Sequence, residues 1–546
     1  MTIAGDNLRI DRTRGRNLAK LMKISLISIE DGIDNIGFRK LSAYIRQIND
    51  KTDVLYVTTG NLRSIRRMLL GSTEKNLDTE DFKHIASEVR ESEIVGFSSM
   101  TQYADVTAAI IAEVRKANPR ALIVWGGIHP IIAPEEAILH ADAVCTGEGE
   151  FAFEMLINAF MEGRSLVHVP GFWIRTEAGI SKNANLPLQT QEDMDRLPPP
   201  TYQDGEKIYK SGHGFLSATP KDYVTWAGLS YNTVWSIGCP MRCTYCGNTK
   251  FIDYDQNYKK VRHASPRTII NEIKNAVAKH PHISTIAFHD DSFMALPLPV
   301  IQEFSESYAS EVGLPFVVFG VIPNYIREEK MRLLLKAGMN RIRMGIQSGS
   351  QAVLDFYDRP TPVARIREAC KIINKYADYM IPPAFDIILD NPIETVEDTR
   401  ATLDLLHEMP KPYTLNIYSL RVMPNTKLAD TLRERGIDVG DISTNYMKHV
   451  PTLGNIAVYV ISLFNLPDWL FNKLRQRTFP THQEQPHYPR LMLFVKFFFL
   501  LHRLMDHLRF MDFTVLTGAP GYIAWRIGLI RVWRRHFQPR FKGESP

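Results

Sequence analysis

The chain contains little cysteine, with five residues among 546. A disulfide scaffold of this size would need many more, so disulfides are not expected to hold the fold. Two of the five, Cys145 and Cys370, stand alone in the sequence and are expected to be core thiols of a reducing compartment. The N-terminal residues are polar and lack the apolar run of a secretory signal peptide. We therefore expect a cytoplasmic protein.

The chain also lacks a strong charge bias, because its formal net charge is only +5. A nucleic-acid-binding protein would need its positive charge gathered on one face, and no such module is recognisable, so nucleic acid is not an expected partner. The apolar fraction of 45% is typical of a globular protein. The length predicts three or four structural units.

The order of apolar runs and polar turns divides the chain into five segments. Residues 1–22 are expected to be a flexible arm, and residues 23–165 alternate strands and helices as in a Rossmann-like (flavodoxin-like) α/β domain. Residues 166–225, which include a proline cluster, are interpreted as a linker. Residues 226–430 resume the alternation with about six β/α units, which predicts a partial barrel. Residues 431–546 are basic and aromatic with helical spacing, which predicts a helical C-terminal extension.

Three cysteines are gathered in eight residues, at Cys239, Cys243 and Cys246, directly after a predicted strand. Three thiolates on one short loop can bind three iron corners of a cubane cluster and leave the fourth iron open to a small molecule. The alternative is a zinc site, which normally requires four ligands. His263 could be the fourth ligand, but it lies well downstream. The spacing therefore favours an iron–sulfur cluster.

The pattern Cys-x3-Cys-x-Tyr-Cys resembles the signature of the radical S-adenosylmethionine (SAM) superfamily, whose members share a partial β/α barrel. The resemblance implies a 4Fe-4S cluster whose open iron binds SAM. Reduction by a flavodoxin or ferredoxin would then yield a 5′-deoxyadenosyl radical that removes hydrogen from a substrate. Cofactors of this kind carry the difficult chemistry, and the protein positions and shields them.

Three further segments resemble the SAM-binding elements of this superfamily. Asp290 and Asp291 follow the second strand of the predicted barrel, where a carboxylate would bind the SAM amino group; alternatively, one of them simply caps the next helix. Gln347 and Ser348 lie in a segment that resembles the superfamily's fifth-strand segment, which usually has Glu where this chain has Gln347. They could equally form a strand-to-helix turn. Arg421 lies in the segment that closes the barrel.

Glycine-rich turns end three predicted strands of the N-terminal domain. Alone they indicate only a flavodoxin-like domain with a ligand beyond its strand ends. Ahead of a radical SAM barrel, their order resembles the cobalamin-binding domain of a subgroup that includes class B radical SAM methylases and the anaerobic magnesium-protoporphyrin cyclases. The resemblance assigns cobalamin contacts to Ser98, Ser99, Gly126, Gly127, Gly147, Glu148 and Gly149.

The loop after the first strand carries Asp34 where many cobalamin domains have a cobalt-binding histidine. Asp34 is interpreted as a helix N-cap, so no histidine ligand is expected from this loop. His129 is the alternative ligand, although a loop position near the corrin edge is the favoured interpretation.

The C-terminal residues 480–546 contain ten Lys and Arg but four Asp and Glu. Such a tail can contact a membrane surface peripherally or deliver a lipophilic substrate. A helical cap on the barrel is the favoured alternative, and the arginines would then be solvated or would meet acidic corrin side groups.

These patterns predict a cobalamin-dependent radical SAM enzyme that activates an sp3 carbon of a small, lipophilic substrate, such as a terpenoid, tetrapyrrole or lipid. Methylation from methylcobalamin is the favoured reaction. A cobalamin-dependent cyclase or rearrangement enzyme is the alternative within the class. A cobalamin-binding sensor with a vestigial cluster site is the alternative from another class, and the intact cysteine triplet disfavours it.

Overall fold

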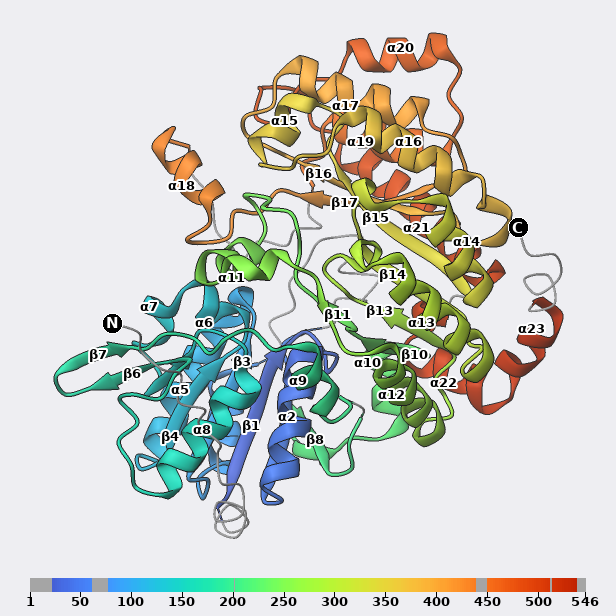
Figure 1. Ribbon diagram of the computed structural model, residues 1–546. Helices are drawn as coiled ribbons and strands as arrows, with labels where there is room; N and C mark the ends of the chain where they lie inside the picture. The colour runs from blue at the N-terminus through green and yellow to red at the C-terminus, as the bar shows by residue number, and fades with distance from the viewer. Residues whose placement is uncertain (1–21, 61–76, 201, 438–448, 511–512, 538–546) are drawn as a thin grey trace, which may run out of the picture.

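The computed structural model describes residues 22–60, 77–200, 202–437, 449–510 and 513–537 (Figure 1). Two separate sheets of mainly parallel strands are followed by a helical C-terminal region, which confirms the predicted α/β fold class. The predicted arm over residues 1–22 lies outside the described residues except for its last residue.

A nine-stranded sheet forms the N-terminal part of the described chain, in the order β7-β6-β5-β4-β3-β1-β2-β8-β9. Its central strands are parallel, and the register pairs Ile24 with both Thr52 and Ile94. Because parallel strands end at the same edge, the residues after them form one ligand-facing rim. The central strands are β1 (Ile24–Glu30), β2 (Thr52–Thr58), β3 (Ile94–Ser99), β4 (Leu122–Gly126) and β5 (Ala143–Cys145).

Helices cover both faces of this sheet. On one face α2 (Ile36–Ile48) and α8 (Gly149–Met161) bury Phe38 and Phe153 against Leu26. On the other face α4 (Thr79–Glu88) and α5 (Ala104–Ala117) contribute to a second core that contains Ile27 and Ile110. Two short helices, α6 (Ile128–Ile132) and α7 (Pro134–Ala137), follow β4.

The segment 166–225, interpreted from sequence as a linker, adds strands to both edges of the sheet. Glu206 in β8 forms a buried ion pair with Arg39 at 3.0 Å. The sequence indicates short strand-like pieces here, such as residues 169–176, among polar turns. Because these strands are short and one of them carries a buried charge, their pattern did not show that they belong to the sheet. The elements are β6 (Phe172–Thr176), β7 (Gly179–Lys182), α9 (Gln191–Arg196), β8 (Glu206–Lys210), β9 (Gly214–Ser217) and α10 (Pro220–Ala227).

The second sheet contains six parallel strands in the order β10-β13-β14-β15-β16-β17. It is an open, partial barrel, because β10 and β17 form its two edges. The strands are β10 (Ser230–Thr233), β13 (Thr285–Phe288), β14 (Phe316–Val321), β15 (Met339–Gln347), β16 (Ala384–Leu389) and β17 (Thr414–Ser419).

Helices follow the barrel strands and bury the largest apolar core of the described chain. The start of α17 is fixed by a capping box in which Thr395 and Asp398 exchange side-chain hydrogen bonds with each other's backbone. The helices are α12 (Pro266–Lys279), α13 (Leu298–Glu311), α14 (Glu328–Ala337), α15 (Gln351–Phe356), α16 (Val363–Asn374), α17 (Val396–Glu408) and α18 (Lys427–Glu434).

The C-terminal helices pack against the barrel. Helix α19 (Leu453–Leu463) contacts α17, β17 and α21 (Pro489–Arg509), whereas α22 (Gly518–Arg526) contacts α10. Helices α20 (Asp468–Gln476) and α23 (Leu529–Phe537) complete this region. Among the described residues, no helix has both the length and the apolar character required to cross a bilayer.

Candidate cofactor sites

The three cysteines lie on a loop between the short strand β11 (Ser236–Ile237) and helix α11 (Asn248–Tyr254). The Cys239 amide donates to the Tyr258 carbonyl at 3.1 Å, and the Cys246 amide donates to the Cys243 carbonyl at 2.9 Å. All three cysteines contribute to one small cluster with Met241, Tyr245, Ile322 and Tyr325.

Three thiols on one loop match the three protein ligands of a cubane cluster with one open iron. Among the described residues, no three His, Cys, Asp or Glu side chains form a group that could hold one metal ion. Cubane ligands bind different iron corners and need not converge on one point. Burial raises the pKa of Cys239 and of Cys246 to about 12, so binding of iron must displace their protons.

A buried arginine that the sequence analysis did not identify contacts this loop. Arg359 donates from Nη1 to Cys243 Sγ at 3.4 Å and from Nη2 to the Gly345 carbonyl at 2.6 Å. Only 5% of Arg359 is exposed. Burial alone would lower the pKa of Arg359. The nearby Tyr245 and Cys243 raise it by a larger amount, so the net pKa lies above the usual value. No sequence motif joins Arg359 to the cysteines, because 116 residues separate it from Cys243.

Asp290 and Asp291, which the sequence analysis did not distinguish, have different hydrogen-bond partners. Asp290 is buried and accepts hydrogen bonds from the Trp235 amide at 3.0 Å and from the Ser236 amide at 2.7 Å. The Ser236 hydroxyl donates to the same carboxylate. Asp290 therefore anchors the chain just before the cysteine loop.

Asp291 faces the cysteine loop itself. Its Oδ2 accepts from the Gly238 amide at 3.4 Å and from the Tyr258 hydroxyl at 3.3 Å. Gly320 allows β14 to approach this turn, since a Cβ there would lie 1.8 Å from the Asp290 carbonyl oxygen, and its φ is +63°. Neither aspartate makes a side-chain hydrogen bond that caps the following turn.

The other residues assigned to SAM follow later strands of the barrel. Gln347 ends β15 with a φ of 74°. Ser348 is buried, exchanges a hydrogen bond with Thr402 at 3.1 Å and accepts from the Ser350 amide at 3.1 Å. Ser348 therefore builds the strand-to-helix turn, and Arg421 is half-buried after β17. Their contact with SAM stays a prediction.

A cavity of about 610 Å³ extends from the ligand-facing rim of the N-terminal sheet to the barrel. Predicted cobalamin contacts line it at Ser98, Gly126, Gly127, Gly147, Glu148 and Gly149. Ser99 does not line it, because Ser99 is buried and accepts a hydrogen bond from the Trp125 indole at 3.0 Å. The barrel side of the cavity is formed by Val234, Ile237, Phe251, Tyr258 and His289.

The lining of this cavity suits a large cofactor, because glycine-rich backbone forms one part of its wall and apolar side chains form another. A Cβ at Gly127 would lie 2.9 Å from the Ser99 backbone, so the loop after β4 packs against β3 without a side chain. Apolar side chains of β1, α2 and α8 form the deeper wall, among them Leu26, Phe38 and Phe153. Burial, with Asp31 and Asp34 nearby, raises the pKa of Glu30 at its margin to about 8.

Glu148 links the cavity to the barrel. Its carboxylate accepts from Arg262 at 2.7 Å and from the Gln189 amide at 2.7 Å. Arg262 belongs to β12 (Arg262–His263), which pairs with β11 beside the cysteine loop. The predicted cobalamin residue is thus also an interdomain contact.

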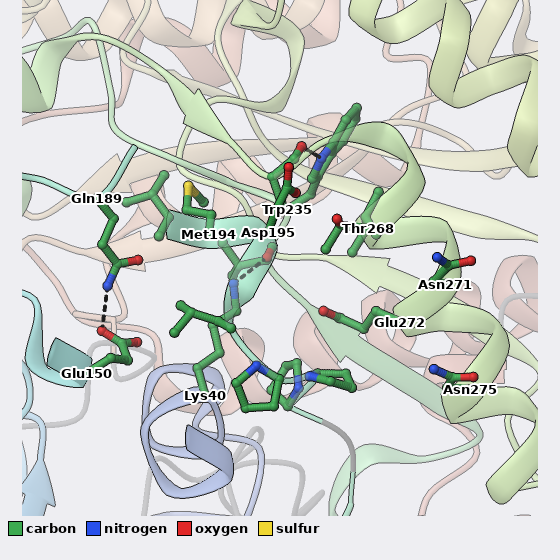
Figure 2. Close-up of a pocket in the computed structure, with 18 residues that line it drawn as sticks. Lys40, Glu150, Gln189, Met194, Asp195, Trp235, Thr268, Asn271, Glu272 and Asn275 are labelled. Carbon is green, nitrogen blue, oxygen red and sulfur yellow. Dashed lines mark hydrogen bonds between the residues drawn. The ribbon is translucent and has the colours of Figure 1, made fainter. Parts of the chain in front are cut away.

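A further cavity of about 240 Å³ lies at the interface between the N-terminal domain and the barrel (Figure 2). Lys40 of α2 donates to the Val234 carbonyl at 2.9 Å, and Gln189 donates to Glu150 at 2.8 Å. Thr268 and Glu272 of α12 line the opposite side. This interface is therefore formed partly by residues of the segment 166–225, which the sequence analysis interpreted as a linker.

The interpretation of Asp34 as a helix cap is wrong. The N-cap of α2 is Asn35, whose side chain accepts from the Phe38 amide at 3.0 Å. Asp34 instead accepts from Asn232 of β10 at 3.1 Å and so joins the two domains. Both residues are common helix caps, so the sequence alone did not distinguish them.

His129 is buried in α6 beside Trp125, with a distance of 5.0 Å between ring centroids. His129 does not line the cavity of about 610 Å³, although its neighbour Ile128 does. Burial lowers the pKa of His129 to about 4, so its ring is neutral at pH 7. These features favour a structural role for His129.

Comparison with known proteins identifies both domains. Residues 23–157 match the B12 binding domain family, and residues 233–406 match the radical SAM superfamily. An uncharacterized methyltransferase of Pyrococcus horikoshii, PH0819, is 24% identical over 61% of this chain and 68% of its own length. The anaerobic magnesium-protoporphyrin IX monomethyl ester cyclase of Rubrivivax gelatinosus is 22% identical over 63% of this chain, which spans 58% of that protein.

A solved structure shares the fold of nearly the whole chain. OxsB, a cobalamin-dependent SAM radical enzyme solved with aqua-cobalamin and SAM, superposes with a TM-score of 0.61 and 15% identity. The match covers 95% of this chain and 76% of OxsB. With its B12-binding domain, radical SAM domain and three loop cysteines, the chain is a cobalamin-dependent radical SAM enzyme that uses a 4Fe-4S cluster, SAM and cobalamin.

Proposed function

We propose that this enzyme methylates an sp3 carbon of a small, lipophilic substrate. When bound, the cluster and SAM supply the radical that removes a hydrogen atom, and cobalamin supplies the methyl group. A low-potential protein such as flavodoxin or ferredoxin would deliver the electron. The relative named a methyltransferase supports this reaction class.

One observation carries the proposal, namely the cavity that both domains share. Ser98 and Gly126 line it from the B12-binding domain, whereas Ile237, Tyr258 and His289 line it from the barrel. Ile237 directly precedes the cysteine loop, and His289 directly precedes the aspartate pair. A substrate carbon between the two cofactor sites would therefore be within reach of both, which is the proximity that a two-cofactor transfer requires.

The chain's own residues would bind SAM and exclude water. Asp291 is the aspartate that we assign to the SAM amino group, because Asp290 already accepts three hydrogen bonds from Trp235 and Ser236. Apolar side chains such as Ile128 and Phe251 line the shared cavity and would keep water from the reacting carbon.

A smaller cavity of about 280 Å³ adjoins the shared cavity and offers space for substrate. The two cavities share five lining residues, namely Glu30, Asn35, Ile36, Met100 and His289. With a pKa of about 8, the Glu30 carboxyl is mostly protonated at neutral pH and can donate a hydrogen bond to a substrate oxygen.

A cyclase is the second candidate, because three relatives at 22–24% identity bear the name of the anaerobic magnesium-protoporphyrin cyclase. Both reactions would use the same cysteines and the same cavity. The test is anaerobic turnover of candidate lipophilic compounds with SAM that carries a deuterated methyl group. Methylation predicts a product that retains the deuterated methyl, and cyclisation predicts a product without it. The Cys239→Ala variant is the matched inactive control.

A further inference from the structure

Helix α21 has two apolar faces, and only one of them is covered within the described chain. Met492, Val495 and Phe499 are buried in the barrel core with residues of α19. The opposite face exposes eight large apolar side chains, with Phe494 at 61% and Met505 at 62%. The eight are Leu491, Leu493, Phe494, Phe497, Phe498, Leu501, Leu504 and Met505, here called the α21 outer stripe.

The α21 outer stripe is continuous along the helix. At 3.6 residues per turn these positions occupy less than half of the circumference, and the helix is about 30 Å long. The buried Lys496 and His507 lie on the inner side. A globular monomer rarely exposes a contiguous apolar surface of this extent, so such a surface marks an interaction site.

Basic residues lie at both ends of the stripe. Arg490 is exposed at the first turn of α21, and Arg509 is exposed at its last turn. Helix α23 adjoins that last turn, because the Trp533 indole donates to the Leu508 carbonyl at 3.0 Å, and its Arg531 is exposed too.

Negative charge is scarce on the same helix. The acidic residue of α21, Asp506, is 16% exposed and lies 3.2 Å from His502. The outer surface of α21 therefore combines a central apolar stripe with cationic ends.

We propose that the α21 outer stripe binds the surface of a lipid bilayer with anionic headgroups. A helix lying in the bilayer plane would bury Phe494, Phe497 and Phe498 at the acyl boundary, and Arg490 and Arg509 would meet phosphate groups. Pairing with a second copy of the chain fits less well. A twofold axis across α21 would place Arg490 against either Arg509 or its own counterpart, and both arrangements juxtapose like charges.

The test is co-sedimentation of the reconstituted enzyme with vesicles of phosphatidylcholine alone or mixed with phosphatidylglycerol. We expect the enzyme to bind the mixed vesicles, with an affinity that falls as salt is added. Binding to vesicles of phosphatidylcholine alone should be several-fold weaker. The triple variant Phe494→Ser, Phe497→Ser, Phe498→Ser should lose binding by at least about tenfold. The double variant Arg490→Gln, Arg509→Gln should weaken binding to the mixed vesicles alone.

The matched control is Leu139→Ser with Ile180→Ser, which removes exposed apolar side chains from the N-terminal domain and should leave vesicle binding unchanged. Cobalamin binding and thermal unfolding would show that each variant is folded. Failure to bind anionic vesicles, or equal binding to both vesicle types, would overturn the proposal. So would light scattering that shows a dimer which the triple variant converts to a monomer, since the stripe would then be a homomeric interface. None of these readouts requires turnover, so the result is independent of the proposed methylation.

Discussion

The Arg359 guanidinium donates to Cys243 Sγ at 3.4 Å, so a permanent positive charge is buried against one of the three cluster cysteines. A cluster becomes more negative when it takes up an electron. A nearby cation therefore stabilises the reduced state, and hydrogen bonds to sulfur act in the same direction.

Replacement of Arg359 by Gln should lower the midpoint potential of the cluster. The expected shift is on the order of 60 mV, which corresponds to a tenfold change for a one-electron couple. A redox titration followed by electron paramagnetic resonance measures it. Arg367→Gln, which removes only an exposed ion pair with Glu408, is the control. An unchanged potential in an Arg359→Gln protein with full iron content would show that the contact does not tune the cluster.

If the three loop cysteines bind the cluster, their substitution should remove it, whereas substitution of the two core cysteines should not. Substitution of Cys239, Cys243 or Cys246 by Ala should remove the 4Fe-4S cluster and SAM cleavage together. Cys145→Ala and Cys370→Ala should retain both, because these thiols are buried in the cores of the two domains. Iron and sulfide content of the anaerobically reconstituted proteins tests this prediction. Retention of the cluster in a loop variant would exclude that cysteine as a ligand.

Substitution of Asp290 should lower the stability of the protein, whereas substitution of Asp291 should weaken SAM binding. Asp290→Asn places an amide N–H group among the amide donors of Trp235 and Ser236, so we expect a loss of about 1–3 kcal/mol in the free energy of unfolding. Asp291→Asn should leave stability and iron content unchanged and should weaken SAM binding. Thermal unfolding and calorimetric titration with SAM separate these effects. Wild-type SAM affinity in Asp291→Asn would contradict our assignment.

The same residues show how far sequence reasoning reached. The alternation of strands and helices predicted the two sheets, because local periodicity is a property of consecutive residues. The cysteine spacing predicted the cluster loop for the same reason. Contacts between distant segments were not predictable in this way. Arg359 reaches Cys243 across 116 residues, and Glu206 contributes a buried ion pair to a sheet strand within the segment interpreted as a linker.

The cobalt ligand set gives an independent prediction for the B12-binding domain. His129 is buried against Trp125 and does not line the cavity, and the loop after β1, residues 31–35, contains no histidine. Reduced cobalt in the enzyme should therefore show no nitrogen hyperfine splitting from a protein imidazole. Splitting that disappears in His129→Gln would prove that His129 is the ligand.

If both cofactors act on one substrate to transfer a methyl group, the ratio of the products formed from SAM must reflect two uses of SAM per turnover. A methylase consumes one SAM to recharge cobalamin and a second SAM to make the radical. With substrate present, S-adenosylhomocysteine and 5′-deoxyadenosine should therefore accumulate in near-equal amounts per methylated product. Formation of product and 5′-deoxyadenosine without matching S-adenosylhomocysteine would contradict the methylase assignment and favour the cyclase.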